Sequence, residues 1–185
     1  NIAFEYENLG NFEQAIIYLK KSLEVNPEND AALYELAFCF ELANKPEDSI
    51  KYYEDYLEKY PFSSAAWYNM GVSSNKLGLY EKAIDYYDYA LAIDEDFSSA
   101  YFNKANALAN LGKYNEAIEQ YNHTFNYEIP EAVTYYYIGE CYEKMEDVEK
   151  AIVNYQKAVK VDANFSDAVF NYKIAICAKL LDIKC

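Results

Sequence analysis

The sequence predicts an all-α fold made of helix hairpins that stack side by side. Three observations predict it: one phrase recurs along the chain at a constant interval, the apolar residues in each copy are spaced as on helices, and glycine or proline stands between the helical stretches. The 185 residues are 52% apolar and 18% aromatic, which is enough for a packed core. Disordered segments are poor in apolar residues, so this composition argues against disorder.

Columns of small and large residues carry the repeat from one copy to the next. One position is small in every copy, and its members are evenly spaced: Ala15, Ser49, Ala83, Ala117 and Ala151. A position one helical turn later is large in every copy: Leu19, Tyr53, Tyr87, Tyr121 and Tyr155. A second small column lies in the preceding helix: Ala37, Gly71, Ala105 and Gly139. Because a large side chain on one helix lies over a small one on its partner, we expect the two backbones of each hairpin to approach closely.

The repeat divides the chain into helical elements in order, all in a single array. Residues 1–29 hold most of a first hairpin, and residues 166–185 hold one further helix. Between them lie four complete hairpins: 30–63, 64–97, 98–131 and 132–165. The sequence thus predicts about eleven helices.

Turn residues mark where each helix begins and ends. The two helices of a hairpin are separated by a glycine in three copies: Gly10, Gly78 and Gly112. Pro46 takes the corresponding turn in the second copy and suits the first turn of a helix. The second helices are expected to end at prolines: Pro27, Pro61 and Pro130. Serines are expected to cap the helices that follow: Ser64, Ser98 and Ser166.

The internal pattern of each copy resembles the tetratricopeptide repeat, a helix–turn–helix unit of about 34 residues. W-x₂-MG-x₂-S at 67–74 and A-x₃-Y at 83–87 return as Y-x₂-IG-x₂-Y at 135–142 and A-x₃-Y at 151–155. The resemblance covers essentially the whole chain. It implies a right-handed superhelical solenoid whose concave groove holds an extended peptide or a partner helix. Lys173 stands in the second small column, so we expect the last helix to be a terminal cap with one solvated face.

Helix geometry leaves one face of each first helix free of stacking contacts, and the resemblance places function there. The candidate groove residues are Tyr34, Phe38, Tyr68, Asn69, Phe102, Asn103, Asn106, Asn110, Tyr136, Tyr137 and Glu140. The rings at Tyr34, Tyr68, Phe102 and Tyr136 occupy the column in which chaperone-binding members carry lysine, so the aromatic column argues against capture of an acidic tail.

An interrupted column of asparagines runs along this face. Asn69, Asn103 and Asn171 occupy equivalent positions in their copies, with Glu35 and Tyr137 in the gaps. An amide offers a donor and an acceptor together, which matches the N–H and C=O groups of a peptide backbone. The column resembles the asparagine ladder in the repeat domain of O-GlcNAc transferases. The alternative is that these amides simply face water, and the sequence leaves both possibilities open.

Charge and cysteine usage exclude several kinds of partner. A formal net charge of −15 would repel the phosphate backbone of a nucleic acid. No run approaches the roughly 20 apolar residues of a membrane span. The four cysteines (Cys39, Cys141, Cys177 and Cys185) lack metal-site spacing and are expected to be buried, reduced thiols, which favours a cytoplasmic location. The chain opens on Asn1 rather than Met, so its start could be missing.

No group of residues predicts catalysis. The single histidine, His123, is expected on an exposed outer face, and Asp94, Glu95 and Asp96 form a solvated turn without the glycine and distal glutamate of a calcium loop. We therefore expect neither an enzyme nor a metal or cofactor site. The predicted function is a protein–protein interaction module that binds a peptide segment of a partner in its groove. The alternatives are a self-associating scaffold and the non-catalytic repeat domain of a longer enzyme such as a glycosyltransferase.

Overall fold

The chain folds into α-helices joined by short turns, as the sequence predicts. The computed structural model describes residues 2–129 and 131–180, with side chains as far as Ile176, and this part of the chain holds eleven helices and no strand. The helices form two compact units, Asn1–Glu95 and Asp96–Cys185, which are called unit 1 and unit 2 below. The all-α repeat fold is confirmed.

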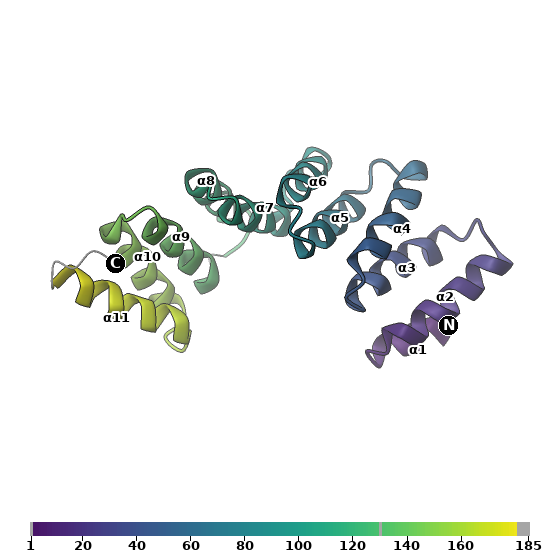
Figure 1. Cartoon of the computed structure of the whole chain (residues 1–185), viewed down its shortest axis with the longest axis horizontal. Helices are drawn as coiled ribbons and strands as arrows, with labels where there is room; N and C mark the ends of the chain where they lie inside the picture. The colour runs from purple at the N-terminus through teal and green to yellow at the C-terminus, as the bar shows by residue number, and fades with distance from the viewer. Residues whose placement is uncertain (1, 130, 181–185) are drawn as a thin grey trace. The chain divides into compact units, whose positions relative to one another are not determined.

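Unit 1 consists of three helix hairpins, drawn in purple to teal in Figure 1. Its helices are α1 (Ile2–Asn8), α2 (Phe12–Val25), α3 (Asp30–Leu42), α4 (Pro46–Lys59), α5 (Ser64–Lys76) and α6 (Tyr80–Ile93). Each helix packs on the next one along the chain, and α3 also contacts α5. The first helices of successive hairpins therefore lie next to each other.

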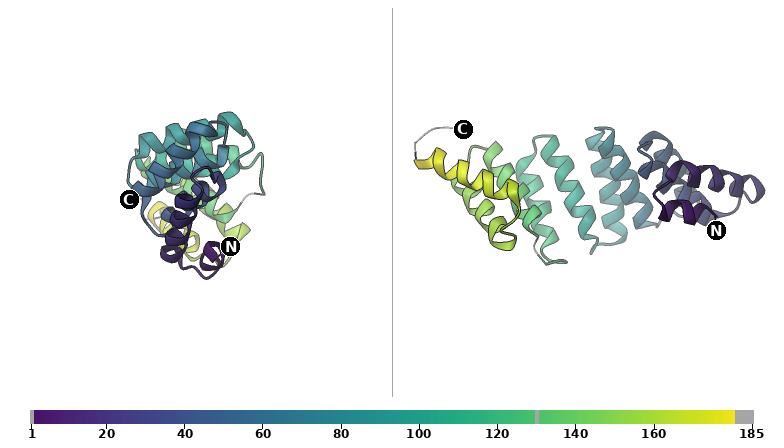
Figure 2. Two further views of the ribbon diagram at one scale, coloured as in Figure 1. Left: turned by 90° about the vertical axis from the view of Figure 1, so that its right-hand side faces the viewer. Right: turned by 90° about the horizontal axis from the view of Figure 1, so that it is seen from below.

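Unit 2 consists of two hairpins and one further helix, drawn in green to yellow in Figure 2. Its helices are α7 (Ser98–Asn110), α8 (Tyr114–Thr124), α9 (Ala132–Lys144), α10 (Val148–Val161) and α11 (Ser166–Leu180). The helix α9 contacts both α10 and α11. The helix α8 is 11 residues long where α10 has 14, and it ends before the predicted proline, Pro130, which lies outside the described residues.

Every hairpin turn places the same repeat position in the left-handed backbone region. The φ angles at this position are +69° (Gly10), +58° (Asn44), +72° (Gly78), +76° (Gly112) and +61° (Glu146). The next N–H then bonds back into the first helix, as Lys45 N does to the Phe40 carbonyl at 2.9 Å, which is the Schellman ending of a helix. The predicted glycine turns are confirmed, and the structure adds an asparagine and a glutamate that adopt the same strained conformation.

The predicted serine caps are wrong by one residue. Ser64, Ser98 and Ser166 are the first residues of α5, α7 and α11, so they lie inside the helices. At α5 the cap is Ser63, whose side chain accepts a hydrogen bond from Ala66 N at 3.3 Å. The helices α2, α3 and α10 are capped in the same way by side chains of Asn11, Asn29 and Asp147. A pair of adjacent serines, as at 63–64, does not tell which one has the non-helical backbone that a cap needs.

From the second hairpin onward, the core of each hairpin is a tyrosine ring laid over a small residue, and Leu19 takes the place of the ring in the first. Tyr87 and Tyr155 are fully buried, and a Cβ atom added at Gly71 or Gly139 would lie 2.5 or 2.6 Å from their rings. Tyr53 and Tyr121 are also buried, in hairpins whose small residue is alanine. The predicted packing of large over small columns is confirmed. Lys173 of α11, in the small column, is exposed as predicted.

Ala117 tests this packing, because its side chain is fully buried in α8. Ala117→Leu should lower the free energy of unfolding by roughly 1–3 kcal/mol, since the added atoms overfill a packed site. Lys82→Ala is the matched control, because Lys82 is exposed on α6. Chemical denaturation of both variants gives the two values, and equal stabilities would contradict the packing register.

A substitution at Glu146 can test the turn conformation, because a left-handed backbone destabilises a non-glycine residue by roughly 1–2 kcal/mol. Glu146→Gly should therefore raise the free energy of unfolding by roughly 0.5–1 kcal/mol, after the larger backbone entropy of glycine in the unfolded chain is subtracted. Asn44→Gly is the control and should change stability less, since asparagine tolerates this conformation. A loss of stability in Glu146→Gly would show that the turn is not strained.

Candidate functional site

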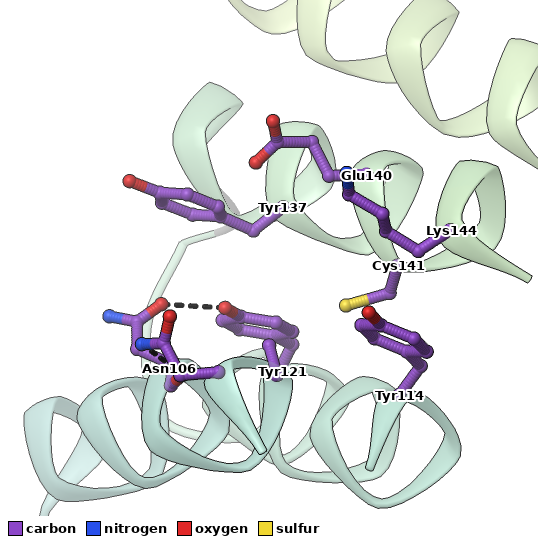
Figure 3. A pocket seen from close by; sticks show the side chains of 9 residues that line it. Asn106, Tyr114, Tyr121, Tyr137, Glu140, Cys141 and Lys144 are labelled. Carbon is purple, nitrogen blue, oxygen red and sulfur yellow. Dashed lines mark hydrogen bonds between the residues drawn. The ribbon is translucent and has the colours of Figure 1, made fainter. Parts of the chain in front are cut away.

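Unit 2 contains a pocket of about 510 Å³ between α7, α8 and α9, here called the unit 2 pocket (Figure 3). The residues that line it are Asn106, Ala109, Asn110, Tyr114, Tyr121, Tyr137, Glu140, Cys141 and Lys144. Four of them belong to the groove predicted from the sequence: Asn106, Asn110, Tyr137 and Glu140. The fold thus brings these four residues together.

Hydrogen bonds fix the orientation of the polar groups around the pocket. The Tyr121 hydroxyl donates to Asn106 Oδ1 at 2.6 Å, and Asn110 Nδ2 donates to the Asn106 backbone carbonyl at 3.0 Å. The Tyr136 hydroxyl donates to Glu140 Oε1 at 2.9 Å. Asn106 uses its carbonyl oxygen in this network, and within the described residues its NH₂ group has no acceptor.

Core packing places the tyrosines that line the pocket. Tyr121 stands in the large column of α8, where its ring meets Phe102 edge to face and lies parallel to the ring of Tyr137 at 6.0 Å between centroids. The side chain is buried, and its hydroxyl points to Asn106 (Figure 3). A residue selected to fill the core therefore also orients a residue of the site.

The pocket mixes charges and holds its ionisable core groups in their neutral forms. Burial, and behind it Glu140, raises the pKa of the Cys141 thiol to about 12. Burial also raises the pKa of Tyr136, and the hydrogen bond to Glu140 adds to the rise. The lining therefore combines Glu140 and Lys144 with a neutral thiol, tyrosine hydroxyls and amides. This set suits hydrogen bonding rather than nucleophilic chemistry.

The remaining predicted groove residues of unit 2 surround the pocket or lie apart from it. Phe102 and Tyr136 both contact the Tyr137 ring, at 5.8 and 5.5 Å between centroids, and so support one wall. Asn103 is half-buried on α7 and does not line the pocket. The sequence did not assign Tyr114, Tyr121 or Cys141 to the site: Tyr121 stands in a packing column, and Cys141 is expected from the sequence to be a buried thiol. A hydroxyl on a packing residue was the signal that could have found Tyr121.

The structure corrects the predicted role of Asn69 in unit 1. Asn69 is 9% exposed, and its Nδ2 donates to the hydroxyls of Tyr34 and Tyr53 at 3.0 and 2.9 Å. Both amide hydrogens are used inside the protein, so Asn69 cannot offer them to a peptide. Asn171 repeats part of this arrangement in unit 2, where its Nδ2 donates to the Tyr136 hydroxyl at 3.3 Å. Both amides thus join the first helices of neighbouring repeats, Asn69 to Tyr34 and Asn171 to Tyr136.

The other groove residues predicted in unit 1 support this core. Phe38 is half-buried against the cluster that contains Tyr53 and Met70. Tyr68 is half-buried, with its ring centroid 5.9 Å from that of Tyr87. Tyr34 meets Tyr53 edge to face at 5.5 Å.

The described side chains offer little for metal or acid–base chemistry. His123 is half-buried and stacks on Tyr101 at 5.1 Å between ring centroids, so the prediction that it is exposed is wrong. No group of three or more histidine, cysteine or acidic residues within the described part of the chain could hold a metal ion. Cys39 and Cys141 are buried and free as predicted, whereas the side chains of Cys177 and Cys185 lie outside the described residues.

Among the residues that the structure describes, none of the helices combines the length and the apolar character that a membrane span requires.

Helix hairpins that recur at a constant interval, with tyrosine packed over glycine, define a helical repeat protein of the kind that mediates protein interactions. Three sequence profiles described as tetratricopeptide repeat match the chain, at residues 64–97 and 132–165, at residues 9–70, and at residues 86–119. The chain belongs to the tetratricopeptide repeat family. A comparison with curated protein sequences found no match.

Solved structures of repeat proteins have the same fold. MamA is 24% identical, with 90% of this chain and 97% of that chain covered and a TM-score of 0.83. YrrB, described as a TPR protein with an unusual peptide-binding site, is 23% identical, with 94% and 89% covered and a TM-score of 0.79. The C-terminal part of a TPR repeat-containing protein from Cytophaga hutchinsonii is 21% identical, with 98% and 71% covered and a TM-score of 0.84. These identities support the fold and leave the ligand open.

The role of Asn69 can be tested by a double-mutant cycle with Tyr53. Asn69→Leu should lower the free energy of unfolding by roughly 1–3 kcal/mol, because it leaves the buried Tyr53 hydroxyl without its donor. In the Tyr53→Phe background the same change should cost less, since that hydroxyl is already absent, and the coupling should fall in the range of roughly 0.5–3 kcal/mol seen for contacting residues. Additive effects in denaturation experiments would contradict the bond.

Proposed function

We propose that this protein is an interaction module whose unit 2 pocket binds a peptide segment of a partner protein. Membership of the tetratricopeptide repeat family and the similarity to repeat proteins of known structure support the general role. The observation that carries the specific proposal is the half-used amide of Asn106. Its oxygen is bound to Tyr121 at 2.6 Å, while its NH₂ group remains for a ligand.

The chemistry of the lining matches a polypeptide backbone. A backbone carbonyl of the partner would accept from Asn106 Nδ2, and a backbone N–H would donate to the side-chain oxygen of Asn110, whose nitrogen is already bound to the helix. Two amides on successive turns of α7 would thus meet the N–H and C=O groups of an extended segment, which point to the same side at any one residue, without discriminating between side chains. The Tyr137 ring supplies apolar area beside them, and tyrosine does so at a low cost in conformational entropy.

Pre-orientation strengthens this proposal. Because Tyr121 is fixed by core packing, the Asn106 amide plane is already set before a ligand arrives. A side chain that is ordered in advance loses less entropy on binding than a mobile one. The pocket therefore needs little reorganisation to accept a segment.

The test uses peptides selected from a random library on the intact chain, with affinities measured by isothermal titration calorimetry. Tyr121→Phe removes the anchor hydroxyl and keeps the amide, so binding should weaken only slightly. Asn106→Leu in the same background removes the amide and leaves no unpaired hydroxyl behind. The double variant should lose roughly 1–3 kcal/mol of binding free energy relative to Tyr121→Phe, because the partner's backbone groups would be buried without partners.

Two controls make the result decisive. Thermal melting of the double variant should match that of Tyr121→Phe, which shows that the fold is intact. Lys82→Ala, exposed in unit 1, should leave affinity unchanged. If the double variant binds the selected peptides as tightly as Tyr121→Phe, the amide of Asn106 does not hold the ligand and the proposed site is wrong.

A further inference from the structure

We propose that unit 1 carries a second, separate binding site that takes a lysine side chain of a partner polypeptide. The site is a pocket of about 470 Å³ between α1, α2 and α3, here called the unit 1 pocket. The residues that line it are Ala3, Phe4, Glu7, Tyr18, Leu19, Ser22, Asn29, Ala31, Ala32 and Glu35. None of them belongs to the unit 2 pocket, so the two proposals stand on different residues.

The two glutamates are the charged groups of this lining, and Asn29 and Ser22 are already paired with other groups of the protein. Asn29 Oδ1 accepts from Ala32 N at 3.2 Å as the cap of α3, and Asn29 Nδ2 donates to Ser22 Oγ at 3.4 Å. The remaining lining residues are mainly apolar. Phe4 and Leu19 have the largest side chains among those without a polar atom. The pocket thus combines an apolar passage with the carboxylates of Glu7 and Glu35.

The charges of both carboxylates raise the pKa of the same buried group, the Cys39 thiol. Burial, followed by the charge of Glu7, raises the pKa of Glu35. Burial raises the pKa of the Cys39 thiol to about 12, and the charge of Glu7, its hydrogen bond with the thiol and the charge of Glu35 add to that rise. Within the described residues neither glutamate forms an ion pair, and the ammonium group of Lys21 on α2 lies instead over the Tyr18 ring, 5.1 Å from its centroid. The two like charges therefore influence each other with no internal cation to balance them.

The next repeat shows which group is missing. Glu41 stands one repeat after Glu7, and there Lys76 Nζ lies 3.1 Å from Glu41 Oε1 and donates to the Glu41 backbone carbonyl at 3.3 Å. The residue one repeat before Lys76 is Leu42, which is 42% exposed. The architecture that gives Glu41 a lysine therefore gives Glu7 a leucine.

A second copy of the same column leads to the same conclusion. Glu143 stands four repeats after Glu7, and the Tyr155 hydroxyl donates to it. The residue that corresponds to Tyr155 in the first repeat is Leu19, which lines the unit 1 pocket. In the part of the chain that the structure describes, Glu7 thus lacks both of the internal partners that the repeat supplies elsewhere.

A lysine of a partner would supply the missing charge and fit the walls. Its four-carbon stem would lie along Phe4 and Leu19, as long cationic side chains do on apolar surfaces, and its ammonium group would reach the carboxylates. Glu35 adds a second carboxylate at the position where Asn69 stands in the next repeat. Lys76 on Glu41 is the structural precedent for the head group, which is why we commit to an ammonium group on a polypeptide.

The first experiment titrates the intact chain with n-butylammonium chloride and follows backbone amide resonances of unit 1 by NMR. n-Butanol is the neutral probe of the same shape. We expect saturable shifts around the unit 1 pocket with n-butylammonium, and affinity at least about five-fold weaker for n-butanol, because charged hydrogen bonds contribute more than neutral ones. Glu7→Gln and Glu35→Gln should each remove that difference. Equal affinities for the two probes in the wild-type chain would overturn the proposal.

The second experiment restores the missing partner within the chain. Leu42→Lys should pair with Glu7 as Lys76 pairs with Glu41, raise the melting temperature and weaken n-butylammonium binding at least about five-fold by occupying the carboxylate. Leu42→Met is the matched control, with a long unbranched side chain and no charge, and should leave probe binding unchanged. If Leu42→Lys binds the probe like Leu42→Met, Glu7 is not the receiving group.

The third experiment separates a polypeptide from a free amine. The probe is the peptide acetyl-Ala-Leu-Lys-Leu-Ala-amide, compared with the same peptide carrying glutamine in place of lysine. The lysine peptide should bind about ten-fold or more tightly than both n-butylammonium and the glutamine peptide, since backbone and side-chain contacts add to the ion pair. A lysine peptide no tighter than n-butylammonium would assign the pocket to small amines and overturn the polypeptide partner. The peptide affinities are read from unit 1 amide resonances in the Tyr121→Phe/Asn106→Leu double variant, so binding at the unit 2 pocket does not enter the comparison.

Discussion

The packing of one tyrosine ring over a glycine or alanine is the contact on which every hairpin after the first depends. A Cβ atom at Gly71 or Gly139 would come within 2.6 Å of the facing ring, so these helices approach as closely as a side chain allows. Burying a ring of this size supplies much of the apolar stabilisation available to a hairpin, and it fixes the rotation of the second helix about its axis. The position of every residue on the open face follows from that rotation.

Tyrosine brings a second constraint, because its hydroxyl enters the core with the ring and needs a partner there. Asn69 supplies one for Tyr53, Asn106 for Tyr121 and Glu143 for Tyr155. In the part of the chain that the structure describes, the Tyr87 hydroxyl is buried without a hydrogen-bond partner. Asn75 stands in the column of Glu143 and so corresponds to the partner of Tyr155, but its side-chain oxygen is also buried without a partner among the described residues. An unpaired buried hydroxyl costs roughly 1–3 kcal/mol, so the partner residue is under strong constraint where it is present. Polar groups on the open face are therefore held in place by the core.

Most of the fold could be predicted from the sequence, whereas the hydrogen-bonding state of the candidate site could not. The constant repeat interval and the small and large columns determine which helices pair, and the structure agrees with them at Tyr87 and Gly71. The interval says where Asn69 lies but not that two tyrosine hydroxyls take its amide hydrogens, because that depends on distances between different repeats. For the same reason the column assigned Tyr121 to packing alone, although its hydroxyl also orients Asn106.

The two pockets differ in charge because the residues in the columns of Glu7 and Lys76 vary between repeats, while the core columns stay the same. In the Glu7 column, Glu41 forms an ion pair with Lys76 inside the protein. One repeat earlier, Glu7 keeps the glutamate but Leu42 stands in the place of the lysine, whereas at the unit 2 pocket Lys144 is kept and Ala109 stands in the place of the glutamate. Removing one member of an internal pair leaves the other exposed to a ligand without altering the packing beneath it. In the unit 1 pocket this leaves two carboxylates without an internal cation from the described residues, whereas the unit 2 pocket keeps Lys144 together with Glu140. A uniform scaffold can therefore present pockets of different charge.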